Sequence, residues 1–192
     1  MPPRRLTEQQ LTDTIREVIE NARQREAAYL PRAVGLTEEQ KNHVRAFFPG
    51  QLLNQVKVLE LEGERLLNPA FQQRAEGRGY RLMLDFSHKA QIAHPKLIIF
   101  QEKITPRLLF HALVHVTQYA ALGLERYLEL YVRAFAQTGT YTSVPFEIQA
   151  FRLDQHYTEH PERPFSVEEE VRQWFESGGY TVPASTERKH GT

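Results

Sequence analysis

A chain of 192 residues, 41% of them hydrophobic, is long enough to bury the core of one domain, expected to span residues 1–192. Lys and Arg total 24, as do Asp and Glu, so no net charge attracts nucleic acid or an anionic membrane, and neither is expected as a partner. The chain has no cysteine, which excludes disulfides, thiolate nucleophiles and Cys-ligated metal sites and leaves His, Asp and Glu as the strong metal ligands.

The start of the sequence does not resemble an export signal. Arg4 and Arg5 lead into a polar stretch instead of an apolar one, and no apolar run reaches the length of a membrane span. The cytoplasm is therefore the expected compartment. Residues 183–192 are polar enough to predict a flexible tail.

Two N-terminal helices are predicted within residues 1–50. A capping box of Thr7 and Gln10 precedes apolar residues at helical spacing, which predicts a first helix running to about residue 29. A second box, Thr37 with Gln40, predicts a short helix that the Pro-Gly pair at 49–50 is expected to end.

A small sheet is predicted next. The β-rich segments are separated by a polar, Gly-containing stretch, and they lie at residues 56–61, 80–86 and 97–100. The signal supports three or four strands. The two N-terminal helices are expected to cover one side of this sheet.

The C-terminal half predicts four helices, at about residues 105–123, 124–137, 145–156 and 166–174. Thr105 and Pro106 are the N-cap and first residue of the first of them, and Gly139 ends the second. Ser166 with Glu169 caps the last. Helices, then a small sheet, then more helices is an α+β order.

Two histidines on one of these helices suggest a metal site. His111 and His115 are four residues apart, so both imidazoles project from one face and can share a cation. The spacing alone also fits two histidines that satisfy hydrogen bonds on a half-buried helix, in a structural or interaction protein without metal. The flanking sequence favours the metal site.

Residues 111–119, HALVHVTQY, resemble the HELVHVxQ helix of zincin-like metallopeptidases of the gluzincin type, in a bacterial branch of that family. The resemblance covers about residues 80–157, with Ala112 where the family has Glu. It implies a zincin-like α+β fold, with helices packed on a small mixed sheet and the HxxxH helix after the edge strand. Residues 97–100 would be that strand.

The resemblance also implies the third metal ligand. Residues 145–150, PFEIQA, look like the later helix of the family, so the ligand role is carried over to Glu147. Its nearest competitors are Asp154 and His156. Two imidazoles and one carboxylate fit Zn²⁺ and leave a fourth tetrahedral position for water.

Ala112 decides what such a site could catalyse. The Glu of HExxH takes a proton from the attacking water, and general acid–base catalysis contributes about 10²–10⁴-fold. Ala112 has no proton acceptor, so we expect a zinc-binding protein with little or no peptidase activity. The alternatives are an active metallohydrolase with another base, such as Asp85, His88 or Asp154, and an introduced Glu→Ala change.

Several residues around the site need an assignment. Gln118 and Tyr119 follow the histidines at helical spacing, and with Asp154 they are candidates for hydrogen-bonding a metal ligand or contacting substrate. For Tyr119, a packing role in the core is favoured. His88 and His94 are expected at the surface, although the zincin-like layout could bring this region near the cleft. The aromatic residues Tyr127, Tyr131 and Phe135 are expected in the core. A peptide or protein substrate would bind in a cleft beside the edge strand by strand addition.

Overall fold

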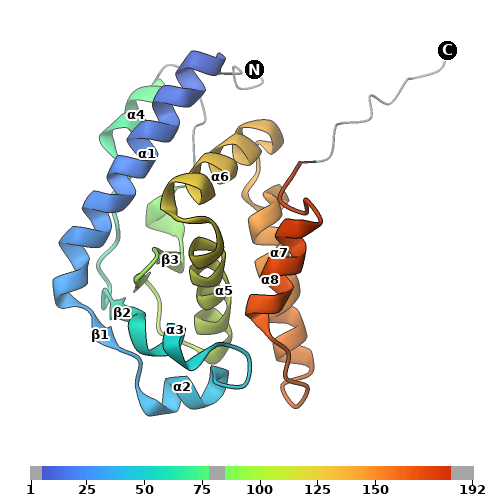
Figure 1. Ribbon diagram of the computed structural model, residues 1–192. Helices are drawn as coiled ribbons and strands as arrows, with labels where there is room; N and C mark the ends of the chain where they lie inside the picture. The colour runs from blue at the N-terminus through green and yellow to red at the C-terminus, as the bar shows by residue number, and fades with distance from the viewer. Residues whose placement is uncertain (1–5, 78–84, 183–192) are drawn as a thin grey trace.

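The computed structural model describes residues 6–77 and 85–182, with side chains at 74–77 excepted. In this part of the chain, eight α-helices surround a four-stranded mixed sheet, so the predicted α+β class is confirmed (Figure 1). The segments 1–5 and 183–192, the second of which was predicted as a tail, lie outside the described residues.

The first helix forms where its capping box predicts. Helix α1 is Glu8–Tyr29, and the Thr7 side chain and the Gln10 side chain each bond the other residue's backbone N–H. These bonds satisfy two donors that the helix start leaves unpaired. The helix buries one apolar stripe, made of residues including Ile15, Val18 and Ala22, and packs against a later helix, α6 (Leu124–Thr138) (Figure 1).

The second helix, α2 (Glu38–Val44), also begins at its predicted box. The prediction that Pro49-Gly50 ends it is wrong. Helix α2 ends at Val44, and Pro49 is the N-cap of a further short helix, α3 (Gly50–Gln55). Proline is tolerated at a helix start because the N–H that it lacks would have no partner there.

The sheet has the order β1-β2-β4-β3, from β1 (Val34–Gly35), β2 (Lys57–Glu60), β4 (Leu97–Phe100) and β3 (Gln91–Ala93). Strands β2 and β4 are parallel, and the two outer strands are antiparallel to their neighbours. The prediction that residues 97–100 form the edge strand is therefore wrong. All four residues of β4 are buried, as expected of a strand with neighbours on both sides and cover on both faces, and the edge strands are β1 and β3.

The polar, Gly-containing stretch between β2 and β3 includes a helix that the sequence did not indicate. This is helix α4 (Ala70–Gly77). Most of the predicted strand at residues 80–86 lies outside the described residues, and Phe86, within them, opens a 3₁₀ turn, η2 (Phe86–His88). Two further 3₁₀ turns are η1 (Leu30–Arg32) and η3 (Tyr141–Ser143).

The remaining helices match their predictions closely: α5 (Pro106–Leu122), α6, α7 (Pro145–Glu159) and α8 (Val167–Glu176). Thr105 caps α5, and Gly139 ends α6 with a positive φ that a glycine adopts without strain. Helix α5 lies at the centre, in contact with α6, α7, α8 and β3 (Figure 1). Every residue of α5 from Leu109 to Tyr119 is buried, so both of its histidines lie inside the protein.

No helix in the ranges 6–77 and 85–182 is long and apolar enough to cross a membrane.

Candidate metal centre

Helices α5 and α7 bring three predicted ligands together. His111, His115 and Glu147 are all buried, and they form a group whose ligand atoms lie within 4.8 Å of one another. The two Nε2 atoms are 3.1 Å apart, and Oε2 of Glu147 lies 3.5 Å from Nε2 of His111 and 3.3 Å from Nε2 of His115. Helical spacing aligns the histidines, and the close packing of α7 on α5 adds the carboxylate.

These three distances fit a metal ion. Zinc bonds of roughly 2.0–2.1 Å at tetrahedral angles place neighbouring ligand atoms about 3.3–3.4 Å apart. The triangle of Nε2, Nε2 and Oε2 has sides of 3.1, 3.5 and 3.3 Å, so it has the size of one face of such a tetrahedron.

The outer nitrogen of His111 is held by Asp154. Nδ1 of His111 lies 2.8 Å from Oδ2 of Asp154, and Oδ1 of Asp154 accepts a hydrogen bond of 3.1 Å from Arg107. A carboxylate paired with a guanidinium is an acceptor, so Nδ1 of His111 must carry the proton. In the neutral imidazole this leaves the lone pair on Nε2, which faces the other two ligands.

The outer nitrogen of His115 is held by Gln118. The Gln118 side-chain N–H groups donate to the backbone oxygen of Phe146 at 3.1 Å and to Oε1 of Gln149 at 2.9 Å, both on α7. This orients Oε1 of Gln118 towards Nδ1 of His115, 2.9 Å away, so that nitrogen is the donor. His115 therefore also presents its Nε2 lone pair to the centre, and Tyr127 lies 3.2 Å from its Nδ1.

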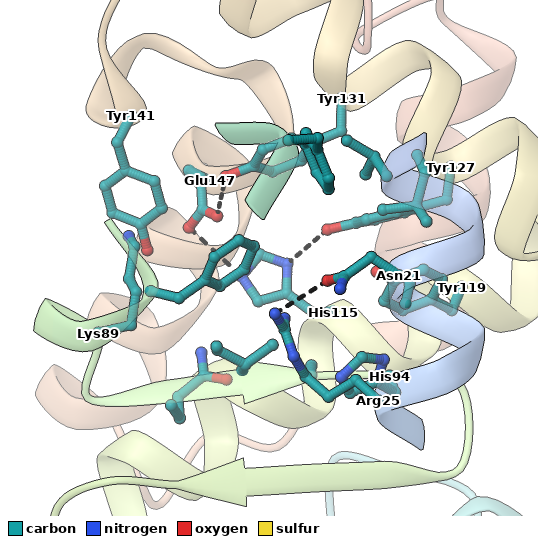
Figure 2. A pocket seen from close by; sticks show the side chains of 18 residues that line it. Asn21, Arg25, Lys89, His94, His115, Tyr119, Tyr127, Tyr131, Tyr141 and Glu147 are labelled. Atoms are coloured by element: carbon teal, nitrogen blue, oxygen red, sulfur yellow. Dashed lines mark hydrogen bonds and ion pairs between the residues drawn. The ribbon is translucent and has the colours of Figure 1, made fainter. Parts of the chain in front are cut away.

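The carboxylate of Glu147 is oriented in the same way. Its Oε1 accepts a hydrogen bond of 2.8 Å from the hydroxyl of Tyr131, shown in Figure 2. Its Oε2 is buried and makes no hydrogen bond within the described residues. A buried carboxylate oxygen without a hydrogen-bond partner is costly, and a cation at this point would remove that cost.

The electrostatics of the site favour an ionised carboxylate. Burial raises the pKa of Glu147, but the imidazoles of His115 and His111 outweigh burial and hold this pKa well below its ordinary value. Burial lowers the pKa of His111, but the hydrogen bond to Asp154 and the carboxylate of Glu147 raise it further, so the net shift is upwards. The buried carboxylate therefore favours a positive charge beside it, which a divalent cation would supply.

Two of the three residues line a cavity. His115 and Glu147 border a cavity of about 100 Å³, together with residues of α1, β3 and α6 (Figure 2). Tyr131 and Tyr141 also line it, and burial together with Glu147 raises the pKa of both phenols above the ordinary value. Both hydroxyls therefore stay protonated and act as donors, not as bases.

Ala112 brings no polar group to this site. The residue is completely buried in the apolar cluster that joins α5 to the sheet, with Leu109, Leu113 and Ile98 among its members. Of the other bases considered, Asp85 and His88 pair with each other at 2.7 Å, and the His88 side chain is 82% exposed. Asp154 is occupied by His111 and Arg107. Glu147 is the one carboxylate among the described residues that line the cavity.

The structure differs from the sequence interpretation at several other residues. His94 was expected at the surface, but it is 2% exposed and lines the cavity, because β3 and the turn after it fold inwards against α5. His88 is exposed, as predicted. Tyr127 and Tyr131 are buried, as expected of core residues, but their hydroxyls also reach His115 and Glu147. The sequence offered one signal for this role: two tyrosines on one face of the predicted helix carry hydroxyls that need hydrogen-bond partners when buried.

Tyr119 and His156 have smaller roles in this geometry. Tyr119 is buried, lies against Tyr127 with ring centroids 3.8 Å apart, and lines the cavity, but it is not part of the ligand group. His156 stacks on Phe165 and does not belong to the ligand group.

The hydrogen bond from His111 to Asp154 is expected to strengthen zinc binding. Replacing Asp154 with Asn removes the charge that holds the imidazole, and zinc affinity should fall by about 10–100-fold, the usual effect of losing such a partner. Competition titration against a chromophoric chelator measures the change. The matched control is Asp13→Asn, an exposed carboxylate on α1, which should bind zinc as the wild type does. Unchanged affinity in Asp154→Asn would show that this contact does not support a ligand.

Comparisons with family models, with curated proteins and with solved structures found no match for this chain.

Proposed function

We propose that this protein binds one zinc ion through Nε2 of His111, Nε2 of His115 and Oε2 of Glu147, and that it lacks peptidase activity. One observation carries the proposal: three buried ligand atoms form a triangle of metal-site size, and every other polar atom of the three side chains is held by a partner in the protein. In a purely structural cluster, nothing would require two imidazole lone pairs and a carboxylate oxygen without a hydrogen bond to point at the same position.

The donor set favours zinc over other cations. Two imidazole nitrogens and one carboxylate oxygen suit Zn²⁺ in four-coordinate geometry, whereas Ca²⁺ and Mg²⁺ take six or more oxygen ligands. The absence of cysteine agrees with a borderline metal held by nitrogen and oxygen. When bound, zinc would supply Lewis acidity and lower the pKa of a water at the open position.

The residues around the open position support binding more than hydrolysis. Tyr131 and Tyr141 supply hydroxyl donors, and Lys89 supplies a cation. No carboxylate other than Glu147 lines the described wall of the cavity, and Glu147 would be a metal ligand. A hydrolase of the zincin type needs a separate base for the attacking water, so the resemblance to zincin-like peptidases is proposed to extend to the metal but not to the reaction.

The proposed peptide substrate is also disfavoured by the shape of the cavity. Strand addition beside this site would have to use β3, the edge strand that lines the cavity, and Val18, Asn21 and Ala22 of α1 line the same cavity. A volume of about 100 Å³ suits a small molecule, not an extended peptide.

Zinc titration of metal-stripped protein tests the proposal. Competition with a chromophoric chelator should give one site per chain, with zinc preferred over magnesium and calcium. Bound zinc should also raise the unfolding temperature, because a ligand of the folded state at about 100 times its Kd adds roughly 2.7 kcal/mol of stability. Zinc that neither competes with the chelator nor shifts the unfolding temperature would leave the three residues as a buried hydrogen-bonding cluster and overturn the proposal.

A further inference from the structure

The cavity beside the metal position contains polar groups that the proposed metal site does not use. It lies between α1, β3, α6 and the ligands His115 and Glu147, and Figure 2 shows Arg25 and His94 on the side opposite Glu147. Its volume of about 100 Å³ is several times the roughly 10–15 Å³ that one water needs, so a small organic molecule can enter.

His94 is a buried polar side chain without a partner. It is 2% exposed, and neither of its ring nitrogens makes a hydrogen bond within the described residues. Burial, together with the charge of Arg25, lowers the pKa of His94 to about 3, so the ring is neutral and offers one N–H donor and one acceptor. Buried polar groups in proteins are nearly always satisfied, which indicates that a molecule in the cavity serves His94.

Arg25 is a half-buried cation without a counter-ion in the described part of the chain. One of its terminal nitrogens donates to the Asn21 side chain at 2.9 Å, and its guanidinium carbon lies 4.2 Å from the centre of the Phe86 ring. No carboxylate of the described residues forms an ion pair with it, and the adjacent Glu26 accepts a hydrogen bond from the backbone of Lys96. Arg25 lines the cavity, and a planar guanidinium can hold a carboxylate by two parallel hydrogen bonds.

The charge of the cavity wall favours an anion. Arg25 and Lys89 bring two cationic groups, and Glu147, the one described carboxylate, is turned towards Tyr131 and the metal position. Lys89 lies over the Tyr141 ring, and burial lowers its pKa to about 8 despite the opposing effect of Glu147. Phe71, Phe86 and the tyrosines supply an aromatic wall, which suits the carbon skeleton of an organic acid better than an inorganic ion.

We propose that Arg25 and His94 form the binding site for the carboxylate of a small organic acid, whose other end points towards the metal position. The carboxylate would pair with the guanidinium of Arg25 and accept the N–H of His94. The carboxylate site stands on Arg25 and His94 alone, and only the orientation of the ligand rests on the proposed metal function. The cavity is thus a site for a small aromatic or aliphatic acid, in reach of a Lewis acid.

Calorimetric titration with benzoate tests this site, with benzamide as the neutral molecule of the same shape. Wild-type protein, in both the zinc-loaded and the chelator-treated form, should bind benzoate about tenfold or more tightly than benzamide, because hydrogen bonds to charged groups are the strong ones. Arg25→Gln should remove this preference in both forms. Arg23→Gln, an exposed arginine on the same helix that pairs with Glu125, is the matched control and should bind as the wild type does.

Equal binding of benzoate and benzamide by the wild type would overturn the proposal, and this comparison does not depend on any variant folding. Benzoate affinity that Arg25→Gln leaves unchanged would also overturn it, as would binding of inorganic phosphate in place of benzoate. The two proposals fail separately. If the protein binds benzoate at Arg25 but does not bind zinc, the carboxylate site is present and the metal function is absent. If it binds zinc but does not prefer benzoate, the metal function is present and the carboxylate site is absent.

Discussion

Replacing His115 with Ala is expected to reduce the bound zinc from about one ion per chain to background. The variant removes one of the two imidazole ligands, so only His111 and Glu147 remain. Two protein ligands are too few to hold zinc through purification. Elemental analysis of protein purified without added chelator measures the change. The same loss is expected for Glu147→Gln, which keeps the shape of the side chain but removes the negative charge and offers a weaker ligand.

The matched control for this experiment is His43→Ala. His43 is exposed on α2 and does not belong to the ligand group, so this variant should keep its zinc. Circular dichroism of each variant shows that the chain is folded. Zinc retained by folded His115→Ala or Glu147→Gln would contradict the assigned ligands, and zinc lost from His43→Ala would place the metal elsewhere.

A glutamate at position 112 is expected to raise hydrolytic activity above that of the wild type. Ala112→Glu would place a carboxylate one residue after His111 on α5, as in the HExxH motif of the zincin-like peptidases. Gain of a general base should raise zinc-dependent hydrolysis of an activated amide or ester by about 10²–10⁴-fold over the wild type. The substitution also places a longer, charged side chain in a fully buried apolar cluster, so a lower unfolding temperature is expected.

Ala112→Gln separates the two effects. It has nearly the same size as the glutamate and also buries a polar group, but it is uncharged and therefore costs less to bury, and it cannot take a proton, so it should stay inactive. Metal content and unfolding temperature are measured for both variants. If Ala112→Glu is folded, loaded with zinc and as inactive as Ala112→Gln, the likeness to a peptidase site is limited to the ligands. Hydrolysis by the wild type at the rate of the variant would instead indicate a base at another position.

The helices were predictable because their ends carry local chemistry. The capping boxes at Thr7 and Thr37, the Thr105-Pro106 start and the Gly139 stop all act within one helical turn, and the structure has helix ends at each of them. Helix α3 was missed because a Pro-Gly pair was interpreted as a stop, although proline is equally compatible with a start.

The sheet was less predictable because strand order depends on long-range pairing. The apolar run of β4 correctly indicated a buried strand, but its central position between β2 and β3 results from long-range pairing that the run itself does not show. Strand β3 has three residues and β1 has two, and neither is long enough to show an alternating pattern.

For the metal centre, the sequence could indicate the residue types but not the contacts. The spacing of His111 and His115 follows from the helix, whereas Glu147 was assigned by resemblance and comes close to them only through the packing of α7 on α5. Other groups reach the site only through the tertiary packing of α1, α6 and β3, which no local pattern determines. They are the hydroxyls of Tyr127 and Tyr131, the His94 ring and the Arg25 guanidinium.

Crystals grown with one equivalent of zinc, with diffraction measured on both sides of the zinc absorption edge, test the central claim most directly. The account predicts a single anomalous peak about 2.0–2.2 Å from Nε2 of His111, Nε2 of His115 and Oε2 of Glu147, with its open side towards the cavity. A map with no peak at this point, or with zinc held by other side chains while these three stay without metal, would contradict it.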